Sequence, residues 1–124
     1  MMSAYLELRK KDAKIAKWMG WYSVGKRRVV VGLSDEDRWM GLPPNPDAMT
    51  VIEIPCYCTN WSDCMAMQNR IPSGMQEMYI EYLIAIVVSE RTDWDARSAF
   101  AVTNAKQEQR VDALLAVLNE HANG

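Results

Sequence analysis

The sequence predicts a compact single domain of the α/β (α+β) class, in which helices cover both faces of a small, mainly antiparallel sheet. Three observations support this prediction. Amphipathic helical patterns lie near both ends of the chain, a run of three valines favours a strand, and the segment EMYIEYLIAIVVS is apolar at nearly every position after Tyr82. A strand that is apolar throughout needs cover on both faces, from helices on both sides or from a second copy across one face.

Length and composition are those of one globular domain. The chain has 124 residues, of which 49% are hydrophobic and 24% charged, so disorder and fibrous repeats are excluded. A formal net charge of -2 provides no global positive field for nucleic acid or an anionic membrane. The charged start MMSAYLELRKKD and the lack of a long apolar run predict a cytoplasmic protein of the host cell, without a membrane partner.

The first predicted element is an amphipathic helix over residues 4–19. Its apolar positions recur at roughly helical spacing, with Lys and Arg on the other face; these positions are Leu8, Ile15, Trp18 and Met19. Gly20 follows where a left-handed C-cap residue belongs. We therefore expect the helix to end near Met19 and Trp21 to fold back on its last turn.

A strand is predicted over residues 27–33, because its three consecutive valines are β-branched. Its beginning is basic, with Lys26, Arg27 and Arg28. The segment that follows, SDEDRWMGLPPNPD, is rich in Pro, Gly and acidic residues and predicts a surface loop over residues 34–48. Loops of this length often carry function.

A second strand is predicted over residues 49–55, where the side chains alternate as a strand requires. A second helix should follow over residues 60–70. Thr59 or Asn60 can cap its N-terminus, and Asp63 in the first turn is favourable to the helix dipole.

The strongest strand pattern lies over residues 77–89 and predicts the central strand of the sheet. Residues 98–102 fit either an irregular segment or a short edge strand. The last helix is predicted over residues 104–120, with an apolar face packed on the sheet. Four polar residues of this helix are expected to face outward: Gln107, Glu108, Arg110 and Asp112.

Several short motifs occur in an order that resembles a known family. They are Asp12-Ala13-Lys14-Ile15-Ala16, then Met19-Gly20-Trp21, then Pro55 with Tyr57-Cys58-Thr59-Asn60-Trp61, and a closing helix rich in Ala and Leu. From about residue 11 to residue 120 the chain resembles the phage ABA sandwich domain family of small phage and prophage proteins, although Cys58 and Asn60 stand where Ser and Asp are expected. The resemblance implies a three-layer α-β-α sandwich, in agreement with the argument from the apolar strand, and it carries over no active site.

No residues form a convincing catalytic or metal-binding pattern. Cys56, Cys58 and Cys64 lack the spacing of a zinc finger or ribbon, and the single histidine, His121, lies in the C-terminal tail. Cys58 precedes a predicted helix, but no general base lies near it in the sequence. We therefore predict no catalytic residues, no metal, no cofactor and no enzymatic activity.

Two alternatives remain open. Asp35, Glu36 and Asp37 in the predicted loop could hold a metal ion in a small enzyme that acts on nucleotides or nucleic acid, although loop acids are usually solvated. The chain could also be a homo-oligomeric assembly module, in which a face rich in Met and Trp forms a homodimer.

The favoured candidate site is a basic cluster with aromatic neighbours. Lys26, Arg27 and Arg28 can bind phosphate oxygens, and Trp39 or Trp61 can stack on a nucleobase. In the other interpretation, the cluster is solvated and blunts the edge of a sheet. We hypothesise a non-catalytic binding protein of phage or prophage that acts against host defence, by occupying a host protein or by sequestering an anionic nucleotide.

Overall fold

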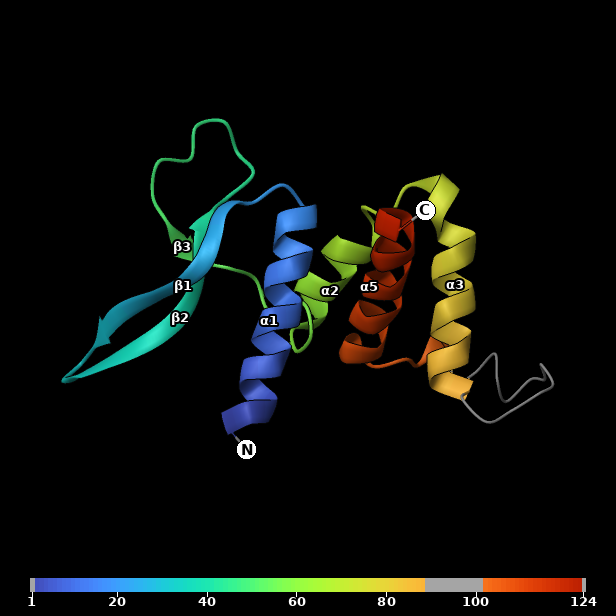
Figure 1. Cartoon of the computed structure of the whole chain (residues 1–124), viewed down its shortest axis with the longest axis horizontal. Coiled ribbons are helices and arrows are strands. Elements are labelled where there is room, and N and C mark those ends of the chain that lie inside the picture. Colours follow the sequence, from blue (N-terminus) through green and yellow to red (C-terminus); the bar gives the residue numbers. More distant parts are fainter. Residues whose placement is uncertain (1, 89–101, 124) are drawn as a thin grey trace. The chain divides into compact units, whose positions relative to one another are not determined.

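Four helices and a three-stranded antiparallel sheet make up the residues that the computed structural model describes, 2–88 and 102–123 (Figure 1). The sheet and the first helix belong to one compact unit, residues 1–56, and the other three helices belong to a second, residues 57–124. The predicted α+β class with a small antiparallel sheet is confirmed. Of the ambiguous segment 98–102, all but Val102 lies outside the described residues.

Helix α1 (Met2–Trp18) ends as its sequence predicts. Gly20 takes a φ of 99°, and its N–H donates to Lys17 O at 3.1 Å. The N–H of Trp21 donates to Ala16 O at 3.0 Å, so the chain folds back on the last turn. These bonds satisfy carbonyls that the end of a helix would leave unpaired.

A long hairpin follows α1 and is formed by β1 (Tyr22–Val31) and β2 (Ser34–Leu42). Gly32, with a φ of 64°, and Leu33 form its turn, and in Figure 1 the hairpin extends away from α1. The short strand β3 (Ile52–Glu53) pairs with Met40 and Gly41, at the C-terminal end of β2.

The prediction of a loop over residues 34–48 is therefore wrong for residues 34–42, and the strand predicted over 49–55 shrinks to β3. Acidic residues have low strand propensity, so the local sequence of β2 favours a loop. Pairing with β1 overrides that preference, because it places Asp37 opposite Arg28 and satisfies the backbone of both strands.

The first helix of the second unit is α2 (Trp61–Gln68), and its N-cap is Asn60, one of the two predicted candidates. The Asn60 side chain accepts a hydrogen bond from the Asp63 N–H at 3.0 Å. Helix α3 (Ser73–Val88) and helix α5 (Gln107–Asn123) run side by side in opposite directions (Figure 1).

The central strand predicted over residues 77–89 is wrong, because residues 77–88 belong to α3. The helix is apolar on several sides, and this lack of periodicity imitates a buried strand. Its length of 16 residues exceeds that of most strands and suits a helix. Without this strand, the sequence argument for a sheet covered on both faces no longer holds.

Both units contain buried apolar side chains. In the first, Ile15, Ala16 and Ile54 are fully or almost fully buried. In the second, the most buried apolar side chains come from all three helices and the segment before them: Tyr57, Cys64, Met67, Leu83, Val111, Leu114 and Val117. Among the described residues, no helix has the length and apolar character needed to cross a lipid bilayer.

Gly41 on β2 provides a test of the hairpin. Between Tyr22 and Gly25 the register shifts, and a Cβ added at Gly41 would lie 3.1 Å from both Tyr22 O and Val24 Cγ2. We expect Gly41→Ala to lower the free energy of unfolding by about 1 to 3 kcal/mol, measured by urea denaturation. Gly25→Ala is the matched control, since its Cβ would meet nothing within 4 Å. Equal effects of the two substitutions would contradict this account of the close approach.

Candidate functional site

The hairpin brings together two of the predicted ligand-binding residues, Lys26 and Trp39. They are direct cross-strand partners, and Lys26 Nζ lies 6.0 Å from the centre of the Trp39 ring. Arg28 lies two positions along β1 and therefore on the same face of the hairpin. Its Nε is 3.5 Å from Asp37 Oδ1, and both side chains are exposed. Lys26, Arg28, Trp39 and Asp37 therefore share one face of the hairpin, with Lys26 over the Trp39 ring.

Arg27, the third basic residue of the cluster, alternates to the other face of the hairpin, opposite Arg38. Arg27 Nη2 donates a long hydrogen bond of 3.4 Å to Ser23 O. Arg38 is bound by Glu36 at 3.0 Å and Glu53 at 3.2 Å. The hydrogen bond to Glu36, followed by the charges of both carboxylates, raises the pKa of Arg38.

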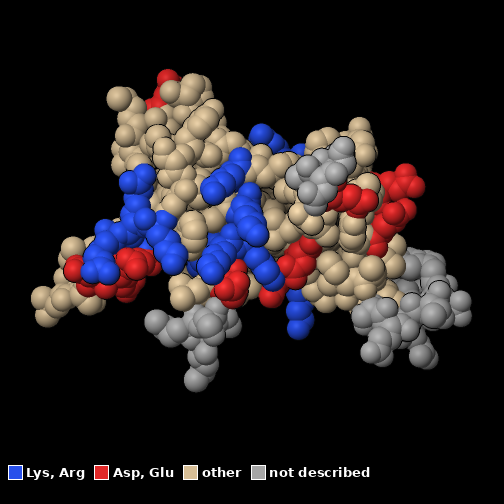
Figure 2. Space-filling model, in the orientation of Figure 1, with Lys and Arg blue, Asp and Glu red and all other residues tan. Residues whose placement is uncertain are grey.

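Lysines of α1 add to the positive charge of the first unit. Lys10, Lys14 and Lys17 are exposed at positions i, i+4 and i+7, along one face of the helix. Residues 1–56 hold nine Lys and Arg against seven Asp and Glu, a net charge of +2, whereas residues 57–124 hold five against nine, a net charge of -4. Figure 2 shows basic side chains gathered over α1 and the hairpin. The first unit therefore carries a local basic patch, although the net charge of the whole chain is negative.

A small hollow lies beside Lys26 and Trp39, with Arg9 and Asp37 also in its wall. Its volume is about 20 Å³, enough for one water molecule or one oxygen atom of a ligand. Trp39 Nε1 is buried and has no hydrogen-bond partner within the described chain. A buried donor of this kind favours an oxygen acceptor next to it.

The acidic residues of β2 do not converge on one point. Side chains alternate along a strand, so Asp35 and Asp37 lie on one face of β2 and Glu36 lies on the other. Asp37 and Glu36 already contact arginines of the sheet. Within residues 2–88 and 102–123, no three potential ligands of the His, Cys, Asp and Glu types are grouped to hold a metal ion. This placement gives no support to the metal-assisted alternative.

Sequence reasoning missed a buried cluster around Arg9. Arg9 is 4% exposed and pairs with Asp12, 1% exposed, at 2.7 Å. It also donates to Ile54 O and Pro55 O, both at 3.0 Å, and contacts Glu53 at 3.5 Å. The guanidinium thus ties α1 to residues 53–56, which have little regular structure of their own.

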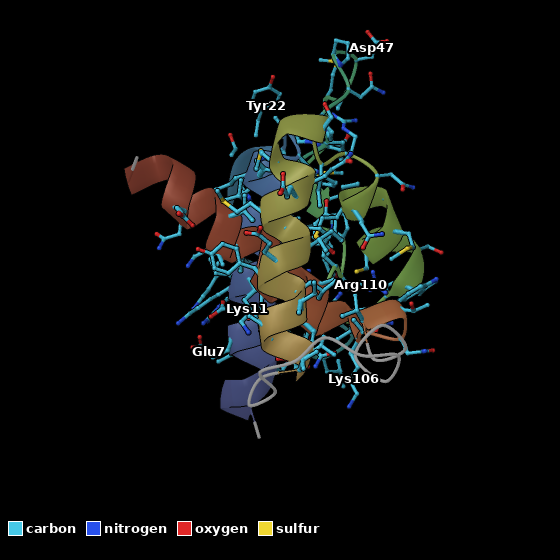
Figure 3. All side chains as sticks on the ribbon, turned by 90° about the vertical axis from the view of Figure 1, so that its right-hand side faces the viewer. Glu7, Lys11, Tyr22, Asp47, Lys106 and Arg110 are labelled. Atoms are coloured by element: carbon cyan, nitrogen blue, oxygen red, sulfur yellow. The ribbon has the colours of Figure 1, made fainter. Side chains whose placement is uncertain are left out.

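Trp61, the remaining predicted ligand-binding residue, belongs to the second unit and has a different role. Its ring lies against the guanidinium of Arg110, with Arg110 Cζ 5.4 Å from the ring centre. Arg110 was expected to face outward, but it is only 8% exposed. It is labelled with Lys106 near the beginning of α5 in Figure 3.

Arg110 organises the polar interior of the second unit. Its Nε and Nη2 donate to Ala105 O and Thr103 O, both at 3.2 Å. Its Nη1 donates to Gln68 Oε1 at 2.6 Å, and the Tyr79 hydroxyl donates to the same oxygen at 2.8 Å. The guanidinium therefore connects α5 to α2 and to the segment that precedes α5.

A signal for both buried arginines is present in the sequence. Arg9, Asp12, Ala13 and Ala16 are spaced as i, i+3, i+4 and i+7, and so are Arg110, Ala113, Leu114 and Val117. All eight side chains are buried. An arginine at the first position of such a stripe, with small side chains after it, can lie along the buried face.

Burial also changes two ionisable groups near Arg110. Desolvation raises the pKa of Cys64 to about 11 and that of Tyr79 to about 12, and the positive charge of Arg110 only partly opposes both shifts. Both groups are therefore neutral at physiological pH. Cys56 lies elsewhere, in the first unit. It is half-buried, and its Sγ is 3.3 Å from Arg9 Nη1.

No family model matches the sequence, and neither the curated proteins nor the solved structures include a significant match to it.

Removing Arg9 should destabilise the first unit. Arg9→Met keeps most of the side-chain volume but leaves Asp12 buried without its closest cation, so we expect a loss of about 3 to 5 kcal/mol in the free energy of unfolding. Lys10→Met is the control, because the Lys10 and Glu7 side chains are exposed and such pairs contribute about 0 to 1 kcal/mol. Similar losses for both variants, measured by urea denaturation, would show that the Arg9 cluster is not stabilising.

Stability should also fall at alkaline pH. Cys64 and Tyr79 ionise near their ordinary values in the unfolded chain but only near pH 11 and 12 in the folded one. The stability they contribute is present below about pH 9 and is lost as the pH rises, by up to about 1.4 kcal/mol per pH unit for each group. Urea denaturation of the protein and of Cys64→Ala from pH 8 to 11 tests this, and a pH slope unchanged by the substitution would refute the role of Cys64.

Proposed function

We propose that this chain is a non-catalytic binding protein that holds an anionic nucleotide on the basic face of residues 1–56. The contact between Lys26 and Trp39 is the observation that supports this function best. An ammonium group can bind a phosphate, while the neighbouring ring offers a surface on which a base can stack.

Three further features are consistent with this proposal. The hollow has Lys26 and Trp39 in its wall and room for one oxygen atom, and the buried Trp39 Nε1 has no acceptor within the described chain. Arg28 lies on the same face and is only loosely paired, at 3.5 Å from Asp37. The exposed lysines of α1 extend the positive charge of the unit and would attract an anion toward it.

The biological setting of the proposal comes from the sequence. The resemblance to the phage ABA sandwich domain family suggests a phage or prophage protein of the host cytoplasm. In that setting, sequestration of an anionic nucleotide signal would counteract host defence. Occupation of a host protein by the same basic face is the version to consider if nucleotides do not bind.

Binding of linear and cyclic nucleotides, measured by isothermal titration calorimetry, tests the proposal. Lys26→Ala should weaken binding about tenfold, since a hydrogen bond to a charged group contributes roughly 1.5 to 3 kcal/mol. Binding should also weaken as the salt concentration rises. Lys106→Ala removes an exposed lysine of the second unit and should leave the affinity unchanged.

Two results would reject nucleotide binding at this face. One is the absence of heat with every nucleotide at millimolar concentration, and the other is an affinity that Lys26→Ala does not change. A host protein captured by the natural chain but not by Lys26→Ala would instead favour the protein-binding version.

A further inference from the structure

The second unit contains a pocket that the proposed function does not use. It has a volume of about 310 Å³, within the range of small-ligand sites, and lies where the end of α2 turns into α3. Its walls are formed by Gln68, Asn69, Ile71, Gln76, Tyr79 and Ile80. The lining therefore combines side-chain amides with two isoleucines.

Hydrogen bonds orient the amide of Gln68. Its Oε1 accepts from both Arg110 Nη1 at 2.6 Å and the Tyr79 hydroxyl at 2.8 Å. A guanidinium cannot accept a hydrogen bond, so the amide cannot be turned to place Nε2 at this position. Gln68 consequently offers N–H donors, and not an acceptor, to a molecule in the pocket.

The charge of Arg110 strengthens this preference. Within the described residues, its hydrogen bonds go to neutral oxygens, those of Thr103, Ala105 and Gln68, and its guanidinium also lies against the Trp61 ring. Arg110 is buried, and its hydrogen bond polarises the Gln68 amide, because hydrogen-bonded groups in a low-dielectric interior polarise one another. The Gln68 Nε2 hydrogens therefore become more positive. A ligand that places negative charge at Gln68 Nε2 is favoured over a neutral or cationic one.

The rest of the pocket indicates the shape of the ligand. Ile71 is buried in its wall and Ile80 is 43% exposed beside it, so together they provide an apolar surface. Gln76 Nε2 donates to Ile71 O at 3.2 Å and holds the turn between α2 and α3. A suitable molecule has an anionic oxygen group at one end and a short hydrocarbon body.

We propose that this pocket binds a small monocarboxylate, with the carboxylate accepting hydrogen bonds from Gln68 Nε2 and the hydrocarbon body lying on Ile71 and Ile80. This site is separate from the basic face of residues 1–56 and does not depend on nucleotide binding there.

Titration of the full chain with hexanoate, followed by NMR, tests the site. Hexanoate should shift the Gln68 side-chain NH₂ resonance and the backbone amides of Asn69 and Tyr79 in a saturable way. Hexan-1-ol, which lacks the charge, and hexylammonium, which reverses it, should bind at least tenfold more weakly.

Gln68→Glu is the decisive variant. It keeps the oxygen that Arg110 and Tyr79 contact, so the fold should be retained or stabilised, but it replaces the Nε2 donor by an anionic oxygen. Hexanoate affinity should fall at least tenfold. Gln109→Glu adds the same charge on α5 outside the pocket lining, and its affinity should change less than threefold.

Several results would overturn the proposal. They are an affinity for hexan-1-ol equal to that for hexanoate, saturable shifts confined to residues outside the pocket, and the same affinity in Gln68→Glu as in the natural chain. If Gln68→Glu failed to fold, Ile80→Glu would serve in its place, because Ile80 is 43% exposed in the pocket wall and a carboxylate there would repel hexanoate. An unchanged affinity for hexanoate in that variant would equally refute the site.

Discussion

Each unit of this protein depends on one buried guanidinium that supplies hydrogen-bond donors to backbone carbonyls between or at the ends of its regular elements. Arg9 binds the carbonyls of residues 54 and 55, and Arg110 binds those of residues 103 and 105. Carbonyls at the end of a helical turn or between regular elements lack the partners of a helix interior or a strand ladder, and an unpaired buried carbonyl costs free energy. The two arginines solve the same problem in two different architectures.

The two guanidinium groups differ in how their charge is balanced. Arg9 has a buried carboxylate, Asp12, within 2.7 Å, and a second, Glu53, at its outer side. Arg110 instead lies against an aromatic ring and donates to neutral oxygens. The attraction within a buried ion pair is largely offset by the cost of desolvating both charges. The main effect of Arg9 is therefore to fix the position of residues 53–56 against α1. The charge of Arg110 retains more influence on its surroundings, which include Cys64 and Tyr79.

Features set by a few neighbouring residues were predictable from the sequence. The end of α1 at Gly20 and the cap of α2 at Asn60 both follow from the conformational preference or side chain of one residue. The hairpin was not predictable in this way, because β2 is stable only when β1 lies beside it. Helix α3 was misread because its apolar residues do not show the periodicity that separates a helix from a buried strand.

The candidate site was predictable only in part. Basic residues at the beginning of a strand could be recognised, but their pairing with Trp39 depends on a register that the sequence does not reveal. Trp61 was grouped with them on residue type alone and instead lies against Arg110. Polar residues on helices are usually exposed, so Arg9 and Arg110 were predicted to lie on the outer faces. The i, i+3, i+4, i+7 pattern that begins at each arginine could have indicated their burial.

The large sequence separation between Arg9 and its partners also affects the order in which contacts of the first unit form during synthesis. Its partners Glu53, Ile54, Pro55 and Cys56 are 44 to 47 residues away. Helix α1 and the hairpin can form from local contacts as they leave the ribosome, but Arg9 reaches its partners only after residue 56 has emerged. Closing so long a loop carries an entropic cost and slows folding. Until then Arg9 lacks its partners in residues 53–56, and only its contact with Asp12 within α1 can form.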